Sequence, residues 1–411
     1  MITIGKNVSH YLNKEPTMSD CDMPVDSRIK NEYHTRPLFF FSSDTQTLEA
    51  FGVHERLEPA VQQEDGRNSE FQATVEAALL QARRSGIDDP IVVGAIPFDT
   101  HEPACLYIPR HYSWQAVDVS NPFRQKGESP VLHLRNQTSI PNEADFKASV
   151  KKALEHLHDS GEIRKIVLAA TRELTFDAAI DVEALLANLR MQNPQGYQFR
   201  LTLSSDEELV GISPELLVRR NGRSIVSNPL AGSARRSTDP EKDRQIADDL
   251  QASEKDQYEH RLVIDDIDRV LRPYCTELHV PRHPALLSTS ALWHLSTRIE
   301  GELQAPPATA LEVACALHPT PAVCGHPTAT ARKLISELES FHRGFFTGAV
   351  GWMNADGDGE WAVTIRCGVV NNGKIRLFAG AGMVPASNPD SEWAEIQTKL
   401  GTMLRACGIS G

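Results

Sequence analysis

Apolar positions recur along the chain with two periods. Spacings of three and four residues predict amphipathic helices over 70–84, 142–160, 239–271, 309–317 and 328–340, and from 388 onward. Short apolar runs rich in β-branched and aromatic residues predict strands over 37–43, 90–98, 104–108, 164–170, 197–204, 208–218, 224–228, 276–280, 296–302 and 344–353. Residues 115–140 read as an irregular connection. Because the strands arrive as hairpins with helices between some of them, we expect an α+β fold with large mixed, mostly antiparallel sheets flanked by helices.

The carboxyl-terminal stretch combines several of these signals. Two apolar runs, 361–370 and 375–379, flank Asn-Asn-Gly, which is a hairpin signature. The second run ends in Gly380-Ala381-Gly382, where small residues either let an anion approach backbone N–H groups or only form a tight turn. The sequence 388–391, Asn-Pro-Asp-Ser, predicts the start of the last helix.

Two predicted helices each carry a pair of acidic residues. Glu392 and Glu395 share one face of the last helix with Lys399, and Asp256 and Glu259 share a face of the helix over 239–271. Solvated faces commonly carry such pairs. Two acidic pairs that faced each other across a cleft would instead offer hard oxygen ligands to a magnesium ion.

Two charged residues interrupt apolar strands. Lys165 either extends its ammonium to solvent or is desolvated and acts as a base. Glu215 follows a proline, and is either a hydrogen-bonded structural residue or an acid. The small-residue turn over 229–236 could bind an anion or only reverse the chain, and Arg366 supplies a cation at the end of a strand.

Length and composition limit the remaining choices. With 411 residues and 40% hydrophobic content, the chain has the make-up of a globular protein. A net charge of −13 argues against nucleic acid and anionic membranes as partners. Seven dispersed cysteines without CxxC spacing predict reduced thiols and a cytoplasmic location, and zinc is not expected. We expect residues 1–35 to be a loosely ordered extension and 36–411 to form one catalytic domain.

Taken together, these stretches resemble the magnesium-dependent chorismate-utilising enzymes, and most of all the siderophore-pathway isochorismate synthases. The resemblance covers about 37–411. It rests on ten stretches in the same order: GAIPFD (94–99), RKIVLA (164–169), GISPELLVRR (211–220), NPLAGSARR (228–236), ASEKDQYEH (252–260), HPTPAVCG (318–325), GAVGW (348–352), GEWAVTIRC (359–367), LFAGAGMVPAS (377–387) and EWAEIQTKL (392–400).

The resemblance implies a fold with the active site in a cleft between sheet and helices, and a role for each candidate residue. Lys165 resembles the base that activates water, and Glu215 the acid that protonates the departing ring hydroxyl. The implied Mg²⁺ ligands are Glu259 and Glu395, with Asp256 and Glu392 in support. The implied carboxylate-binding residues and pocket walls are Gly232, Ser233, Arg366, Gly380, Gly382 and Lys399, together with Ala322, Gly325 and Phe346.

Two positions select among the reactions of this family. Ala231 stands where aminodeoxychorismate synthases carry a nucleophilic lysine, and Lys165 stands where anthranilate synthases carry a glutamine. Ala231 disfavours a covalent amine route, and Lys165 favours water as the nucleophile without separating isochorismate synthases from salicylate synthases. The HPTPAVCG stretch resembles the members that only form isochorismate. Alternatives are a salicylate synthase, which also eliminates pyruvate, and a catalytically silent subunit that binds chorismate or metal. Downstream isochorismate-processing enzymes are possible partners, and a monomer is expected.

Overall fold

Antiparallel strand pairs link almost all of the β-structure into one sheet. The computed structural model describes residues 36–62, 69–116, 132–159 and 161–409, so the predicted extension over 1–35 lies outside the described residues. The strands are β1 (Phe39–Ser42), β2 (Gln46–Leu57), β3 (Ile91–Ile96), β4 (Cys105–Ala116), β5 (Leu134–Ile140), β6 (Lys165–Phe176), β7 (Tyr197–Thr202), β8 (Glu208–Ser213), β9 (Leu216–Asn221), β10 (Ser224–Asn228), β11 (Leu230–Arg235), β12 (Cys275–His279), β13 (Ala285–Ser288), β14 (Leu292–Ser296), β15 (Ile299–Leu303), β16 (Gly325–His326), β17 (Ala349–Asn354), β18 (Gly359–Val363), β19 (Cys367–Asn371) and β20 (Lys374–Met383).

Neighbouring strands follow one path through the large sheet, in the order β5-β6-β20-β19-β8-β7-β1-β2-β4-β3-β17-β18-β9-β10-β15-β12. Strand β16 pairs with β6 at the Lys165 end, and β11, β14 and β13 form a separate small sheet. Every one of these pairings is antiparallel. The α+β fold with large, mostly antiparallel sheets is therefore confirmed.

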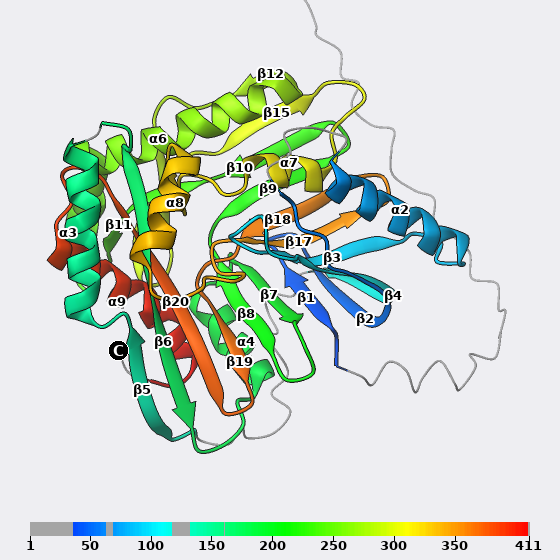
Figure 1. The fold of residues 1–411 in the computed structure, drawn as a ribbon, viewed down its shortest axis with the longest axis horizontal. Coiled ribbons are helices and arrows are strands. Elements are labelled where there is room, and N and C mark those ends of the chain that lie inside the picture. The colour runs from blue at the N-terminus through cyan, green and yellow to red at the C-terminus, as the bar shows by residue number, and fades with distance from the viewer. Residues whose placement is uncertain (1–35, 63–68, 117–131, 160, 410–411) are drawn as a thin grey trace, which may run out of the picture. The chain divides into compact units, whose positions relative to one another are not determined.

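Helices cover the large sheet in two groups (Figure 1). Helices α3, α4, α8 and α9 pack with β6, β8 and β20 around one apolar core, whereas α2, α6 and α7 contribute to a second core with β3, β9 and β18. The helices are α2 (Glu70–Arg84), α3 (Glu143–Asp159), α4 (Val182–Gln192), α5 (Pro240–Ala252), α6 (Glu254–Leu271), α7 (Ala310–Leu317), α8 (Thr328–Leu338) and α9 (Pro389–Ala406), with a short 3₁₀ turn η1 (Arg272–Tyr274).

The sheet changes course where two strand pairs are interrupted side by side. Strands β8 and β9 are separated at Pro214-Glu215, and β18 and β19 at 364–366. Backbone hydrogen bonds join the two interruptions: Ile212 N–H donates to Arg366 O, and Val363 N–H donates to Glu215 O, each at 3.1 Å. Glu215 and Arg366, 151 positions apart in the sequence, are thereby brought to the same break in the sheet.

Several expected elements differ in the structure. One helix over 239–271 is wrong, because Ser253 is extended (φ −66°, ψ 114°) and its hydroxyl caps α6 by accepting from Asp256 N–H, so α5 and α6 are separate. Single strands over 208–218 and 361–370 are also wrong, since both are interrupted. The region 115–140 includes the end of β4 and all of β5, while 117–131 lies outside the described residues. The turn expected over 229–236 is wrong, because Leu230–Arg235 pair with β14 as strand β11. Helix α4 and strands β2, β13, β14 and β16 were not expected.

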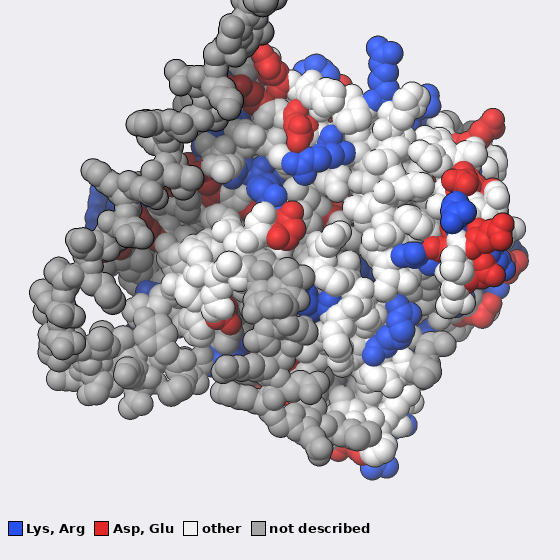
Figure 2. Space-filling view, turned by 180° about the vertical axis from the view of Figure 1, so that it is seen from behind, with Lys and Arg blue, Asp and Glu red and all other residues white. Residues whose placement is uncertain are grey.

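Charged side chains of both signs are interspersed on the face seen in Figure 2, with no single-sign patch covering it. None of the described helices is both long and apolar enough to cross a membrane.

Candidate active site

A cavity lies beside the break in the sheet, and it brings together most of the residues singled out in the sequence. Strands of the large sheet, strand β11, helix α6 and helix α9 all contribute to it. The candidate residues that line it are Glu215, Gly232, Ser233, Glu259, Ala322, Phe346, Arg366, Gly380, Gly382, Glu395 and Lys399. Lys165 lies directly behind this wall against Glu259 and Gly382, and Asp256 and Glu392 lie towards a wider outer cleft.

Glu215 is a buried carboxyl in this cavity, with 2% of its surface exposed. Leu230 N–H donates a long hydrogen bond of 3.4 Å to its Oε1. Burial raises the pKa of Glu215 to about 7, although the charges of Lys165, Arg366 and Lys399 act in the opposite direction. The carboxyl can therefore hold or release a proton near neutral pH.

Lys165 begins β6 and is fully buried, so its ammonium does not reach solvent. Its Nζ lies 3.0 Å from Glu259 Oε1 as an ion pair without hydrogen-bond geometry. The pair fits because position 382 is glycine: a Cβ there would lie 2.3 Å from Glu259 Oε1 and 3.1 Å from Lys165 Cε. Gly382 thus makes room for the Lys165–Glu259 pair as well as lining the cavity.

The acidic faces of α6 and α9 are turned towards each other, which is the arrangement that a magnesium site between the two acidic pairs would need. Lys255 on α6 donates to Glu392 Oε1 on α9 at 2.9 Å, and the other oxygen of Glu392 has no hydrogen-bond partner. Burial raises the pKa of Asp256 and of Glu392, and the negative charge of Glu395 raises both further. Within the described part of the chain, no three acidic, histidine or cysteine side chains already form a complete metal-ligand set.

Two cationic side chains, Arg366 and Lys399, also line the cavity. Arg366 is buried at a left-handed backbone position (φ +52°), and burial lowers its pKa to about 10. Among the described residues, no carboxylate lies within ion-pair distance of its guanidinium. Lys399 Nζ donates to Gly380 O at 2.8 Å and pairs with Glu395 at 2.5 Å. An unpaired buried guanidinium beside an ammonium is a binding site for a carboxylate.

Gly232 and Ser233 lie at a register shift in β11, which a buried histidine holds against α6. His260 Nδ1 lies 3.0 Å from Ala231 O, and burial lowers the pKa of this ring to about 4. Gly232 has φ +81°, and a Cβ there would approach Asp256 Cβ at 3.0 Å. Ser233 Oγ is buried without a hydrogen-bond partner. A free hydroxyl is therefore available at the cavity wall.

His294 and Thr347 line the cavity but did not stand out in the sequence. His294 pairs with Ser233 across β14 and β11, its Nε2 has no hydrogen-bond partner, and burial holds its pKa well below the usual range. It therefore offers the cavity a neutral imidazole. Gly325, in contrast, pairs with Ile166 in β16 and does not line the cavity.

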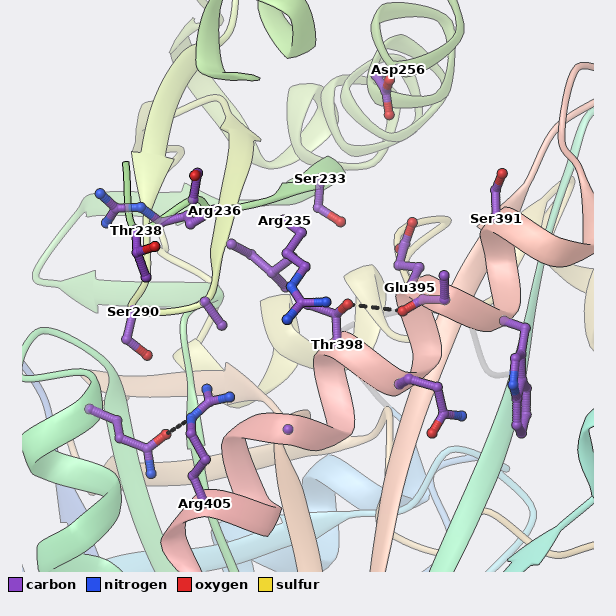
Figure 3. Close-up of a pocket in the computed structure, with 18 of the residues that line it drawn as sticks. Ser233, Arg235, Arg236, Thr238, Asp256, Ser290, Ser391, Glu395, Thr398 and Arg405 are labelled. Atoms are coloured by element: carbon purple, nitrogen blue, oxygen red, sulfur yellow. Dashed lines mark hydrogen bonds between the residues drawn. The ribbon is translucent and has the colours of Figure 1, made fainter. Parts of the chain in front are cut away.

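The cavity continues into a wider outer cleft of about 1270 Å³, because Ser233 and Glu395 line both. One wall is the exposed face of α9 and the other is the small sheet with its loops (Figure 3). The polar residues that define this outer cleft are Gln192, Ser233, Arg235, Arg236, Ser237, Thr238, Lys255, Asp256, Ser290, Ser391, Glu395, Gln397, Thr398 and Arg405.

A buried acid, a buried lysine, facing carboxylates and an unpaired guanidinium define a site for an anionic substrate. Residues 108–408 match the family model of the chorismate binding enzymes. The chain belongs to this family.

Within the family, the chain is similar to isochorismate synthases. It is 44% identical over 382 residues to isochorismate synthase DhbC of Bacillus subtilis (strain 168), covering 90% of this chain and 94% of that protein. It is 43% identical over 374 residues to isochorismate synthase EntC of Escherichia coli (strain K12), covering 90% and 95%. A crystal structure of a putative 2,3-dihydroxybenzoate-specific isochorismate synthase, DhbC from Bacillus anthracis, superimposes with a TM-score of 0.85 at 40% identity, covering 93% of this chain and 99% of the other.

Proposed function

We propose that this protein is an isochorismate synthase that converts chorismate into isochorismate for 2,3-dihydroxybenzoate synthesis. The similarity to DhbC and EntC over nine tenths of the chain supports this function. The observation that carries the chemistry is Glu215, a buried carboxyl with a pKa of about 7 that shares one cavity with Arg366 and lies within the field of Lys165.

The proposed reaction moves two protons and exchanges one hydroxyl group. Lys165 Nζ acts as the neutral amine and accepts a proton from the water that adds to the ring carbon next to the carboxylate-bearing carbon, becoming an ammonium beside Glu259. Glu215 donates its proton to the ring hydroxyl that departs from the far side of the conjugated system. Water is consumed and released in equal amounts, so the net reaction is an isomerisation. General acid and base groups of this kind each contribute about 10²–10⁴-fold to rate.

We further propose that Arg366 and Lys399 bind the substrate's carboxylates, assisted by Ser233 and the backbone at Gly232, Gly380 and Gly382. The buried guanidinium of Arg366 and the unpartnered hydroxyl of Ser233 support this assignment, because a buried cation favours an anion beside it and a hydroxyl without a partner favours a ligand that completes its hydrogen bonds. Ala322, Phe346 and the neutral His294 would close the pocket around the ring.

The cofactor we propose is Mg²⁺, held by Glu259 and Glu395 with Asp256 and Glu392 in support. Four carboxylates are the hard oxygen donors that Mg²⁺ prefers, and burial, with their mutual repulsion as a smaller cause, raises the pKa of Asp256 and Glu392. When bound, the cation would neutralise the ring carboxylate and make the conjugated ring a better electron acceptor. Ion pairs with Lys165, Lys255 and Lys399 neutralise three of these carboxylates, Glu259, Glu392 and Glu395.

The direct experiment incubates the purified full chain with chorismate and Mg²⁺ and follows isochorismate by chromatography. We expect turnover by the wild type and its loss in Lys165→Ala, with Mg²⁺-dependent substrate binding retained. Active chorismate with no isochorismate formed would remove the proposal. Salicylate fluorescence without an added lyase would instead identify a salicylate synthase, and binding without turnover would identify a silent subunit.

The remaining assignments are also proposals. We propose that 36–411 acts as one catalytic domain, that residues 1–35 are an extension, and that the protein works in the cytoplasm as a monomer. Size-exclusion chromatography with light scattering tests the oligomeric state.

A further inference from the structure

The outer cleft contains two arginines that the proposed chemistry does not use. Arg235 ends β11 and Arg405 lies in the last turn of α9, on opposite walls. In Figure 3, the guanidinium of Arg235 extends from its strand to lie beside Thr398, with Arg405 further along the same helix. The two belong to elements 170 positions apart in sequence.

Neither arginine is paired with an acid. Arg405 Nε donates only to the neutral Gln192, at 3.2 Å, and no described carboxylate lies within ion-pair distance of Arg235 or Arg405. The neighbouring Arg236 is different, because it donates to Asp243 at 2.7 Å and its guanidinium lies over the ring of Trp293. Arg236 is therefore neutralised and held, whereas Arg235 and Arg405 leave two uncompensated positive charges in the cleft.

The two charges also repel each other. Burial lowers the pKa of Arg405, and the positive charge of Arg235 lowers it further, so their fields overlap. Both side chains are exposed, so solvent screens this repulsion, and an anion between the facing walls would be attracted by both charges. The chain as a whole is acidic, with a net charge of −13, and repels a dianion at long range.

We propose that the outer cleft is the entry route for the dianionic substrate, and that Arg235 and Arg405 form a cationic pair that attracts it towards the cavity. The proposal rests on the proposed function, because it takes chorismate as the ligand. Ser233 and Glu395 line both the cleft and the cavity. An anion attracted between the arginines would therefore reach the cavity next to Arg366 and Lys399. Two cations without acidic partners raise the local concentration and the association rate of an oppositely charged ligand, although Asp256 and Glu395 also line the cleft.

The test measures kcat and KM for chorismate at saturating Mg²⁺ over ionic strengths from about 0.02 M to about 0.3 M, where the screening length falls below 10 Å. The variants are Arg235→Gln, Arg405→Gln and the double variant. Arg84→Gln is the charge-matched control, because Arg84 is exposed at the end of α2 and lies outside both pockets. We expect the double variant to lose about tenfold in kcat/KM at low salt through KM, with kcat unchanged, and the loss to shrink at high salt.

Lysine variants separate charge from shape. Because attraction depends on charge, Arg235→Lys and Arg405→Lys should keep wild-type kcat/KM, whereas a structural role for the guanidinium would lower it. A double glutamine variant indistinguishable from Arg84→Gln, or a loss that does not change with salt, would overturn the proposal while leaving the isomerase activity standing. A wild type that makes no isochorismate would instead contradict the proposed function itself.

Discussion

At the scale of single residues, Glu215 shows how burial sets chemistry. Its carboxyl is transferred from water into a cavity with one weak backbone donor, so the protonated form is favoured and the pKa rises from 4.5 to about 7. If Glu215 is the acid, kcat should fall as pH rises through about 7, because the carboxyl loses the proton it must donate. Measuring kcat from pH 5.5 to pH 9 checks this.

Glu215→Gln should separate catalysis from stability. We expect kcat to fall at least 10²-fold, because an amide cannot donate a proton to the leaving hydroxyl. A raised folded-state pKa means that the folding contribution of Glu215 is fully present below about pH 4.5 and is lost as pH rises through about 7. The glutamine variant avoids this loss, so at pH 8 its free energy of unfolding should exceed that of the wild type by up to about 3 kcal/mol.

Denaturant unfolding at pH 5 and pH 8 gives the comparison for Glu215→Gln. Near pH 5 the wild-type carboxyl is protonated and the two proteins should have similar stability. A glutamine variant that is less stable than wild type at pH 8 would contradict the assignment of a raised pKa.

Gly382→Ala should disable the site without touching a charged residue. The new Cβ would lie 2.3 Å from Glu259 Oε1, so the Lys165–Glu259 pair must move, and we expect kcat to fall by at least about tenfold. Gly380→Ala is the comparison in the same strand, because its nearest atom, Val167 Cγ1, lies at 3.2 Å and can yield. Steady-state kinetics check the order; equal losses in the two variants would argue against the steric explanation.

Some single residues could be predicted from the sequence and others could not. Lys165 and Glu215 stood out because each charge interrupts an apolar run, where burying it costs free energy unless it is paired or has a role in the site. His294 gave no such signal, because a neutral histidine within the short apolar strand Leu292–Ser296 is compatible with an ordinary core position, and only the pairing of β14 with β11 brings it to the cavity. Gly325 lies in a matching stretch, yet it supports β6 from the next strand and leaves the cavity to Ala322.

At the scale of elements, one buried ion pair ties α8 to the walls of the cavity. Arg343 and Glu339 have side chains 3% and 5% exposed and pair directly. Arg343 also donates to Val323 O at 2.9 Å, to Val167 O at 2.8 Å and to Thr347 Oγ1 at 3.2 Å, all on residues that line the cavity. Glu339 accepts from Ala169 N–H of β6 at 2.8 Å.

Arg343→Met should therefore destabilise the fold by about 3–5 kcal/mol, because it leaves a buried carboxylate unpaired. Adding Glu339→Gln to it should cost much less than the sum of the two single changes, since the pair is already broken. Urea unfolding of the two single variants and the double variant provides the cycle. Additive losses would contradict a coupled pair.

Element boundaries were harder to predict than element types. The hydrophobic period continues through 239–271, so nothing in it marks the break; only the capping hydroxyl of Ser253, which competes with the helical backbone, separates α5 from α6. The interruptions at Glu215 and Arg366 fall inside runs with strand composition, because each is stabilised by a hydrogen bond from the other. Such long-range pairing has no local signature.

At the scale of the whole molecule, the proposed Mg²⁺ site between the acidic surfaces of α6 and α9 would link metal binding to global stability. The two helices are distant in sequence and meet through Lys255 and Glu392, while Glu395 and Asp256 repel each other across the same gap. A cation that binds the folded chain and has no site in the unfolded chain adds RT ln(1 + [L]/Kd), which is about 2.7 kcal/mol at a concentration of 100 Kd. Mg²⁺ should therefore raise Tm by a few degrees.

We expect the rise in Tm to come from Mg²⁺ binding to the carboxylates and not from the higher ionic strength. Differential scanning fluorimetry with Mg²⁺, and with NaCl at matched ionic strength, should show the rise only with Mg²⁺. Glu259→Gln and Glu395→Gln should abolish it, whereas Glu337→Gln, an exposed change of the same charge on α8, should keep it. Because this readout needs no turnover, it tests the metal site separately from the reaction. An equal Mg²⁺ response in all three variants would place the cation elsewhere on the protein.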